Sequence, residues 1–327
     1  MEIIDVLLIL TASVAGIYLI AKGSDWSTDS LVPVAKKLGT SHIAIALIIV
    51  SIMVSLPEIV VALYASFLGH IEISIGVIIG SVIVNIGLMT GLSALITPLK
   101  ISRKLILRDG IFAVCIAIMV LVLSSDLKIT RAEGAAFILI FIPYLINVWE
   151  QEKAEHESQK KKELIDVEKE LSLDLFGKVK AGFLTFVIGM VSLLIGSYLF
   201  SWSLIRISQV SGISDLLIGL TIGAIGPSIP NIVSAVQGTL KGIEYVAVSE
   251  TLGSDIFTLL VTLGILSMIQ PITLSTQWLR FDIPIMVGMS TLLLFFMIRK
   301  PFISRFEGFI LLFSYIGILI ANIFIHL

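Results

Sequence analysis

Long apolar segments alternate with short polar connections along most of the chain. Ten apolar segments of about 20 residues or more can be placed, and this is the length that a helix needs to cross the hydrocarbon core of a bilayer. The predicted spans are residues 3–22, 38–67, 71–97, 105–125, 131–149, 181–205, 212–240, 243–269, 280–298 and 304–325. Tight turns are expected at Gly69 and Gly242, where one span follows another almost directly. The pattern predicts an all-α polytopic membrane protein.

The composition supports the same class. Of the 327 residues, 57% are hydrophobic and 14% are charged, and the mean hydropathy of +1.07 excludes a soluble enzyme. The single cysteine, Cys115, allows no internal disulfide and no cysteine metal cluster. The formal charge of −2 provides no basic surface for nucleic acid. Glu2 and Asp5 stand where a signal peptide carries basic residues, so we expect the first span to be retained.

Lysine and arginine are distributed unequally between the two sides of the predicted bundle. The connections after the first, third, fifth, seventh and ninth spans hold 18 of the 22 basic residues. The remaining four are Lys128, Arg131, Arg206 and Arg280. By the positive-inside rule the richer side is cytoplasmic. We therefore expect a multi-pass protein of the cell membrane with both termini external and the 150–180 loop, a solvated helical linker, in the cytoplasm.

The two halves of the chain resemble each other at an offset of 173 residues. Of the 44 positions from 55 to 98, 12 are identical to their counterparts in 228–271 without a gap. The matched positions include Ser55, Pro57, Gly69, Gly80, Ser81, Gly91 and Pro98, which recur as Ser228, Pro230, Gly242, Gly253, Ser254, Gly264 and Pro271. Because Gly, Ser and Pro pair at one register, we interpret the likeness as an internal repeat and not as shared apolar composition.

Each half contains five predicted spans, and an odd number makes the second half enter the membrane in the opposite sense. The chain is thus predicted to consist of a first five-helix repeat (1–149), a cytoplasmic linker (150–180) and an inverted five-helix repeat (181–327). Inverted repeats are typical of secondary transporters, in which broken helices meet at the bilayer midplane and bind ions. Prolines indicate such breaks in the second and seventh spans, at Pro57, Pro227 and Pro230.

Two acidic residues lie deep in predicted spans. Glu58 stands in an apolar stretch of about 30 residues without Lys or Arg, where an ionised carboxylate costs on the order of 2.5–3.5 kcal/mol unless it is paired, protonated or solvated. A bound cation or a proton would compensate the charge, the alternative being a permanently protonated structural glutamate. Asp255 in the eighth span is also a carboxylate in an apolar stretch and needs the same compensation of its charge. The alternative to an ion-binding role is that Asp255 caps a helix break.

Other polar residues share helical faces with these acids. Glu250, Ser254 and Thr258 recur at every fourth position of the eighth span and therefore lie on one face. Ser81 and Asn85 repeat that spacing in the third span and are expected to face the first stripe across the pseudo-twofold axis. Carboxylate, hydroxyl and amide oxygens are the hard ligands that Na⁺ and Ca²⁺ prefer.

Four motifs resemble the two α-repeats of the sodium/calcium exchanger family of cation/Ca²⁺ antiporters. They are Ser-Leu-Pro-Glu at 55–58, Gly-Ser-Val-Ile-Val-Asn at 80–85, Gly-Pro-Ser-Ile-Pro-Asn at 226–231 and Gly-Ser-Asp-Ile-Phe-Thr at 253–258. The Gly-Ser-Asp-Trp segment at 23–26 is also similar to that family. The resemblance covers essentially the whole chain. It implies ten helices, external termini and a central group of Na⁺ and Ca²⁺ sites between the second, third, seventh and eighth spans.

Matched position by position, the resemblance also implies the ion ligands. The family's site positions fall on Ser51, Val54, Ser55, Glu58, Ser81 and Asn85 in the first half, and on Ala224, Pro227, Ser228, Asn231, Ser254 and Thr258 in the second. Val54 and Pro227 replace the usual Thr, so they are left out of the predicted ligand set, and Asp255 is added to it.

The chain departs from the family pattern at its acidic positions. Asn231 stands where an acid is usual, and Thr258 where an acid or amide is usual. Asp255 and Glu250 occupy positions that are commonly Asn. Of the two glutamates that the family pairs across the twofold to hold Ca²⁺, only Glu58 remains.

We therefore predict a secondary active antiporter that exchanges Ca²⁺ or a related cation against Na⁺ by alternating access, with the first and sixth spans sliding past a fixed core, as the resemblance implies. Two alternatives stay open: a Na⁺ or H⁺ exchanger of the same fold that does not transport Ca²⁺, and a transport-inactive membrane homologue. We expect no enzymatic activity, because no His-Glu-x-x-His or paired-aspartate protease motif is present. We expect no cofactor, and the expected partners are small inorganic cations and the lipid bilayer.

Overall fold

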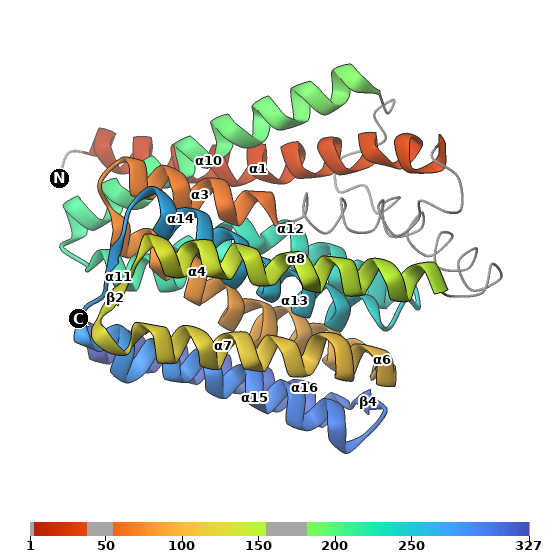
Figure 1. Ribbon diagram of the computed structural model, residues 1–327. Coiled ribbons are helices and arrows are strands. Elements are labelled where there is room, and N and C mark those ends of the chain that lie inside the picture. The colour runs from red at the N-terminus through yellow and green to blue at the C-terminus, as the bar shows by residue number, and fades with distance from the viewer. Residues whose placement is uncertain (1–2, 38–54, 155–181, 327) are drawn as a thin grey trace.

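The computed structural model describes residues 3–37, 55–154 and 182–326, which form a bundle of helices (Figure 1). In this part of the chain, nine helical segments are long and apolar enough to cross a membrane. They are Ile4–Ser30, Ile71–Ile96, Arg103–Asp126, Arg131–Gln151, Phe183–Ser211, Asp215–Leu240, Val246–Ile269, Trp278–Arg299 and Arg305–Ile325. The shorter apolar helix α3 (Leu56–Phe67) belongs to the predicted span 38–67, whose residues 38–54 lie outside the described part. The predicted polytopic all-α fold is confirmed.

The first repeat contains helices that are interrupted by short π-helical and 3-10 segments and by two-residue strands. Its elements after α1 (Ile3–Lys37) and α3 are α4 (Ile71–Val84), η2 (Asn85–Thr90), α5 (Gly91–Ile96), β1 (Leu99–Lys100), α6 (Arg103–Leu105), η3 (Ile106–Gly110), α7 (Ile111–Leu123), η4 (Ser124–Asp126), β2 (Lys128–Ile129) and α8 (Arg131–Ala154).

The second repeat is also interrupted by π-helical segments and two-residue strands. Its elements are α10 (Phe183–Ser211), α11 (Asp215–Ile218), η5 (Gly219–Gly223), α12 (Ala224–Leu240), α13 (Val246–Phe257), η6 (Thr258–Thr262), α14 (Leu263–Ile269), β3 (Ile272–Thr273), η7 (Trp278–Asp282), α15 (Ile283–Arg299), β4 (Phe302–Ile303) and α16 (Arg305–His326).

The irregularities of the two repeats coincide at the predicted offset, which confirms the internal repeat. The π-helical segments η2 and η6 begin at Asn85 and Thr258, which are equivalent positions. The turns at Gly69 and Gly242 have φ angles of 89° and 83°, a region that glycine enters without steric cost, so both predicted tight turns are confirmed. Strand β1 pairs with β4 and strand β2 with β3, so each small sheet takes one strand from each repeat.

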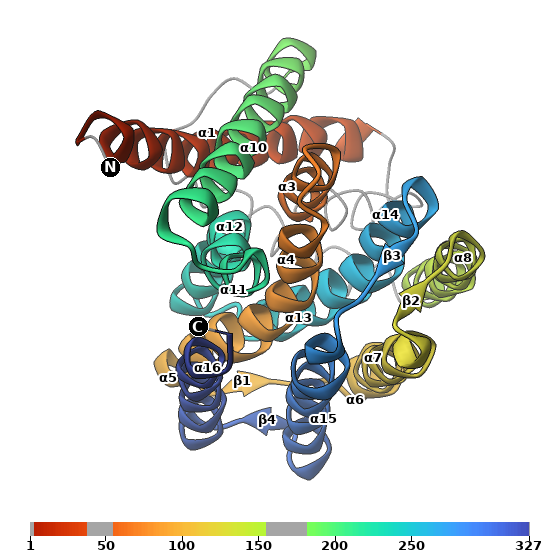
Figure 2. The ribbon, with the colours of Figure 1, turned by 90° about the vertical axis from the view of Figure 1, so that its left-hand side faces the viewer.

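The central helices lie between two flanking groups of helices. In the end-on view, α3, α4, α12 and α13 lie in the middle, α1 and α10 cross on one side, and α7, α8, α15 and α16 lie on the other side (Figure 2). The central helix α4 is buried along almost its whole length, whereas α1 and α16 leave many large apolar side chains exposed. In a bundle without water on its outer surface, this distribution is the one expected of lipid-facing flanking helices around a polar centre.

Glycines allow α1 and α10 to approach each other closely. A Cβ atom on Gly23 would lie 2.5 Å from the backbone nitrogen of Leu193, and one on Gly196 would lie 2.7 Å from that of Ile20. Ser192 donates a hydrogen bond of 3.1 Å to the carbonyl of Leu19 across the same contact. Small residues at a helix crossing are the usual means of bringing membrane helices together.

The same contact explains why the predicted ends of two spans were wrong. The first span does not end at residue 22, because α1 continues to Lys37, and the sixth continues past residue 205 to Ser211. Lys22 lies inside α1 and not in a connection; it is 8% exposed and its Nζ lies 5.2 Å from the centre of the Trp26 ring. Gly23, which follows the predicted end of the first span, is instead packed against α10.

Candidate functional site

The carboxylate of Glu58 lies in the first turn of α3, directly after Pro57, where the helix dipole favours a negative charge. The side chain is fully buried. Its Oε1 atom accepts hydrogen bonds from Ser228 Oγ (3.2 Å) and from Asn231 Nδ2 (3.1 Å), both on α12 of the other repeat. Its Oε2 atom is also buried and has no hydrogen-bond partner in the described part of the chain. One carboxylate oxygen is thus held by the second repeat while the other stays available to a ligand.

Ser228 and Asn231, which bond to Glu58, lie in an irregular stretch of α12. Two prolines, Pro227 and Pro230, lie inside the helix. Because proline has no N–H, neither can donate the helical hydrogen bond to the carbonyl four residues earlier, at Gly223 and Gly226. The π-helical segment η5 ends at Gly223, so the irregular backbone begins directly before the site. Irregular helices of this kind are frequently found at functional sites.

A second buried carboxylate, Asp255, lies on α13. Its Oδ1 atom accepts a hydrogen bond of 3.1 Å from Asn85 Nδ2, which also lies 3.3 Å from Ser254 Oγ. Asp255 is 2% exposed, and its Oδ2 atom has no hydrogen-bond partner among the described residues. The predicted contact between the polar stripes of the third and eighth spans is present, because Asn85 at the end of α4 bonds to two residues of α13.

Hydroxyl groups connect the two carboxylates. Ser55, the residue before α3, contacts Ser254 through their Oγ atoms at 3.4 Å, so the Glu58 and Asp255 regions form one buried polar cluster. Thr258 is fully buried, and its Oγ1 atom has no hydrogen-bond partner within the described part. Ser81 Oγ donates to the carbonyl of Ile78 at 3.0 Å, so its lone pairs stay available.

Three predicted positions have other outcomes. Ser51 lies outside the described residues. Ala224 is buried at the start of α12, where it contacts Gly80 of α4; a Cβ atom on that glycine would come within 2.7 Å of the Ala224 Cβ. Ala224 has only its backbone carbonyl to offer an ion. Glu250 is half-buried on α13, one turn before Ser254.

Two threonines next to the site were not predicted. Thr90 in η2 and Thr251 in α13 share a hydrogen bond of 2.7 Å between their hydroxyls, and both are fully buried. Thr251 Oγ1 also donates to the backbone carbonyl of Asn85 at 3.3 Å. The π-helical segment shifts the backbone hydrogen bonds around Asn85. The hydrogen bond from Thr251 fixes the position of the Asn85 carbonyl.

The ligand chemistry of the cluster is that of a hard cation. Its donors are two carboxylates, two side-chain amides, several hydroxyls and backbone carbonyls, all in a setting without water-exposed surface. Within the described ranges, no group of three or more His, Cys, Asp or Glu side chains could hold a metal ion. The donor set therefore favours ions that accept neutral oxygen ligands over ions that need imidazole or thiolate ligands.

Two inverted repeats that bring buried carboxylates and irregular helices together define a secondary transporter. The comparison with known sequences then gives the family. The chain belongs to the sodium/calcium exchanger family, whose model, described as sodium/calcium exchanger protein, matches residues 8–149 and 181–324. The predicted family is confirmed, and it is a family of transporters and not of enzymes.

The similarity extends over nearly the whole chain of several relatives. The putative antiporter CaxA of Alkalimonas amylolytica is 32% identical, with 89% of this chain and 92% of CaxA covered. The sodium/calcium exchanger MaX1 of Methanosarcina acetivorans is 28% identical, with 95% and 97% covered. A solved structure of the sodium-calcium exchanger NCX_Mj has a TM-score of 0.66 and 27% identity, and the match covers 97% of this chain and 99% of that one.

Proposed function

We propose that this protein is a secondary active antiporter that exchanges Ca²⁺, or a related cation, against Na⁺ at the site between α3, α4, α12 and α13. The observation that carries the proposal is the pair of buried carboxylates, Glu58 and Asp255. Each has one oxygen held by an amide of the other repeat and a second oxygen without a hydrogen-bond partner in the described part of the chain.

An unbalanced buried negative charge requires a counter-charge. An acidic side chain inside a membrane protein pairs with a basic group, takes a proton or binds a cation. No salt bridge to Glu58 or Asp255 is present among the described residues, since the ion pairs there involve other acids. A transported cation supplies the missing charge and the ligand for the unpartnered oxygens. The names of the relatives, which include sodium/calcium exchangers, support Na⁺ and Ca²⁺ as those cations.

Exchange follows if both ions need the same carboxylate, because occupancy by one ion then excludes the other. In the proposed cycle α1 and α10 move past the central helices and open the site to one side at a time. Two contacts between α10 and the central helices support this proposed role of α10. The Phe200 ring of α10 packs against Gly226 of α12, and Ser201 donates a hydrogen bond of 3.1 Å to the carbonyl of Val61. Both contacts lie directly next to the site.

The full set of proposed ligands retains the residues expected from the sequence. It comprises Ser51, Ser55, Glu58, Ser81, Asn85, Ala224, Ser228, Asn231, Ser254, Asp255 and Thr258. We also propose that both termini are external, that residues 1–149 and 181–327 are the two repeats, and that the 150–180 linker is cytoplasmic. The beginning of α1 and the end of α16 lie at the same end of the bundle, which supports placing both termini on one side of the membrane (Figure 1).

Reconstituted vesicles test the proposal directly. An outward Na⁺ gradient should drive uptake of radioactive Ca²⁺ into vesicles that contain the protein, and neither empty vesicles nor the variant Asp255→Asn should reach that rate. Varying Na⁺, Ca²⁺, Mn²⁺ and pH separately identifies the coupled ions. Flux of Na⁺ or H⁺ without any Ca²⁺ movement would refute Ca²⁺ exchange and favour the exchanger without Ca²⁺ transport.

A further inference from the structure

Asn85, the first residue of η2, is held by three residues on one face of α13. Its side-chain Nδ2 atom lies 3.1 Å from Asp255 Oδ1 and 3.3 Å from Ser254 Oγ. Its backbone carbonyl accepts a hydrogen bond of 3.3 Å from Thr251 Oγ1. These three residues of α13 are spaced by three and four positions, so they share one helical face. Both the main chain and the side chain of Asn85 are therefore fixed by the second repeat.

The same contacts determine the direction of the Asn85 amide oxygen. Both hydrogens on Nδ2 are used, one toward the Asp255 carboxylate and one toward the Ser254 hydroxyl. A rotated amide would place its oxygen against the Asp255 oxygen, and two acceptors repel each other. Oδ1 therefore points away from these two partners, and it is buried without a hydrogen-bond partner in the described part of the chain. A buried amide oxygen of this kind is a suitable ligand for a dehydrated cation.

The Thr251 hydroxyl is itself held by Thr90, the last residue of η2. The Oγ1 atoms of the two threonines lie 2.7 Å apart, and both side chains are fully buried. Because a carbonyl oxygen can only accept, Thr251 uses its single proton toward Asn85, and Thr90 must donate to Thr251. The hydrogen bonds thus run in one direction, from Thr90 through Thr251 to the Asn85 carbonyl.

The second repeat shows that a π-helical segment at this place does not need the two hydroxyls. At the offset of 173, the counterparts of Thr90 and Thr251 are Leu263 and Ile78, which are buried and apolar, and the equivalent segment η6 still forms. A hydroxyl in such an apolar contact costs free energy unless it is hydrogen-bonded. The two threonines therefore have a role other than shaping the helix.

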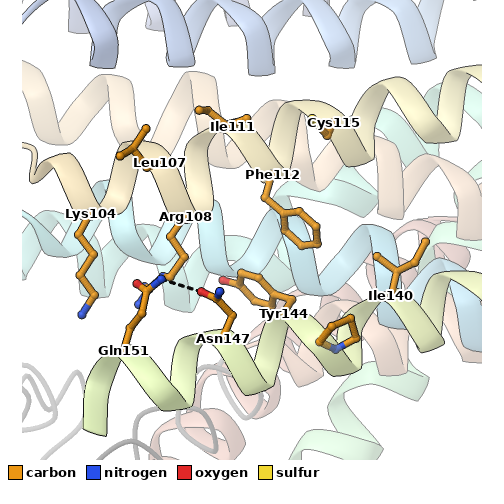
Figure 3. A pocket seen from close by; sticks show the side chains of 11 residues that line it. Lys104, Leu107, Arg108, Ile111, Phe112, Cys115, Ile140, Tyr144, Asn147 and Gln151 are labelled. Carbon is orange, nitrogen blue, oxygen red and sulfur yellow. Dashed lines mark hydrogen bonds between the residues drawn. The ribbon is translucent and has the colours of Figure 1, made fainter. Parts of the chain in front are cut away.

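A buried carboxylate elsewhere in the bundle is held in a different way. Asp109 accepts hydrogen bonds from Arg108 at 2.9 Å and 2.8 Å and from Tyr144 at 3.0 Å. Arg108 and Tyr144 line a groove of about 550 Å³ between α7 and α8, whose described lining includes none of the proposed ion ligands (Figure 3). Asp109 thus has its counter-charge within the protein, whereas no salt bridge to Asp255 is present among the described residues. The Asp255 region therefore depends on the orientation of neutral groups, chiefly the Asn85 amide.

We propose that Thr251 is a positioning residue of the ion site and that Thr90 acts through it. By fixing the Asn85 backbone, the two threonines keep the Asn85 Oδ1 atom directed into the site before the cation arrives, so binding does not have to order this ligand. The affinity of a cation site depends on its rigidity as well as on its charge. The role of Thr251 rests on the proposed cation exchange, although neither threonine contacts the ion itself.

Exchange kinetics in reconstituted vesicles separate this role from a structural one. Thr251→Val removes the hydroxyl at nearly constant volume, and the KM for Ca²⁺ should rise about fivefold, the equivalent of one hydrogen bond of about 1 kcal/mol, with the maximal rate within about twofold of the wild type. Thr251→Ser retains the hydroxyl and should restore the wild-type KM. The matched control is Thr239→Val near the end of α12, where the buried hydroxyl donates to the Ala235 carbonyl of its own helix at 2.8 Å. Its KM should not change.

A double variant tests whether Thr90 acts through Thr251. Thr90→Val alone leaves the hydrogen bond from Thr251 to Asn85 in place, so the KM should rise by only about twofold. The double variant Thr90→Val, Thr251→Val should have the same KM as Thr251→Val, because the Thr90 hydroxyl has nothing left to orient. Increases that multiply would show that Thr90 acts independently and would contradict the proposed order.

An unchanged KM in Thr251→Val, whatever its melting temperature, would overturn the proposal, and so would a raised KM that Thr251→Ser does not restore. If Thr251→Val does not fold, an unchanged KM in Thr90→Val has the same meaning. If wild-type vesicles take up no Ca²⁺, the proposed Ca²⁺ exchange has failed, and the purified proteins are titrated with CaCl₂ and with NaCl. The salt concentration that gives half of the ligand-induced rise in melting temperature then replaces the KM. Equal midpoints in the wild type and Thr251→Val would refute the positioning role alone, and no rise in the wild type would refute the cation site as well.

Discussion

Replacing Glu58 with glutamine isolates the charge of the proposed ion site from its shape. The variant Glu58→Gln keeps an oxygen at the position that accepts from Ser228 and Asn231, and it places an amide nitrogen near the position of Oε2, which has no hydrogen-bond partner in the described part of the chain. Both hydrogen bonds change from charge-assisted to neutral, which weakens each by about 1 kcal/mol. The variant also removes a buried charge, and the free energy gained in this way offsets a similar part of that loss. We therefore expect the free energy of unfolding to change by less than about 2 kcal/mol.

The effect on ion binding should be much larger. At an effective dielectric constant of about 20, a carboxylate and a monovalent cation 4 Å apart attract each other by about 4 kcal/mol, and a divalent ion by about twice as much. Loss of 4 kcal/mol corresponds to about a thousandfold weaker binding. The exchange rate in vesicles should fall below detection, while the melting temperature stays close to that of the wild type.

The matched control is Glu133→Gln. Glu133 accepts hydrogen bonds from the backbone and hydroxyl of Thr130 at the start of α8, far from the site in sequence, and its loss should destabilise that helix end by about 1 kcal/mol without stopping exchange. Wild-type exchange in Glu58→Gln would refute the assignment of the site. Unfolding of the glutamine variant, with Glu133→Gln stable, would show that the Glu58 charge is structural.

Three further outcomes are expected. Protons should compete with the cation, because protonation removes the charge of Glu58, so the apparent cation affinity should fall as the pH is lowered from about 9 to 5, and a flat profile would contradict this. The double variant Asn231→Glu, Thr258→Asp adds two carboxylates to the site and should raise the affinity for Ca²⁺ in a binding titration; no gain would mean that ligand charge does not limit binding. Gly23→Ala should destabilise the α1–α10 contact by about 1–3 kcal/mol in thermal unfolding, since its Cβ would lie 2.5 Å from the nitrogen of Leu193, and wild-type stability would show that the helices can separate there.

The sequence predicts the arrangement of the bundle well because two signals are almost independent of tertiary packing. Apolar length sets where a helix can cross a bilayer, and the repeat of Gly, Ser and Pro at one offset reflects backbone geometry that both halves share. The turns at Gly69 and Gly242 and the equivalent starts of η2 and η6 show that the repeat carries structural information. Glu58, Asn85 and Asp255 could be found because a polar side chain is costly in a membrane span and needs a partner.

Some features that depend on contacts between distant segments could not be predicted. The pair of Thr90 and Thr251 joins residues 161 apart in the chain, and neither residue stands out among the threonines of apolar helices. The end of α1 was misplaced for a related reason. A Gly-Ser pair weakens an isolated helix, but close packing of α1 against α10 compensates for this loss of stability. The hydropathy of α1 does not show which helix packs against it.

The site itself does not follow the symmetry of the fold. Glu58 and Asn231 occupy equivalent positions at the offset of 173, and the amide of one donates to the carboxylate of the other at 3.1 Å. A symmetric pair of glutamates would place two negative charges on the pseudo-twofold axis, whereas here the second charge belongs to Asp255, whose equivalent in the first repeat is Val82. In the described site, the buried oxygens without a hydrogen-bond partner lie on the carboxylates of Glu58 and Asp255, on the amides of Asn85 and Asn231, and on the Thr258 hydroxyl. The negative potential is therefore displaced from the axis toward α13. The two repeats share one backbone arrangement, but the Asp255 carboxylate occurs only in the second.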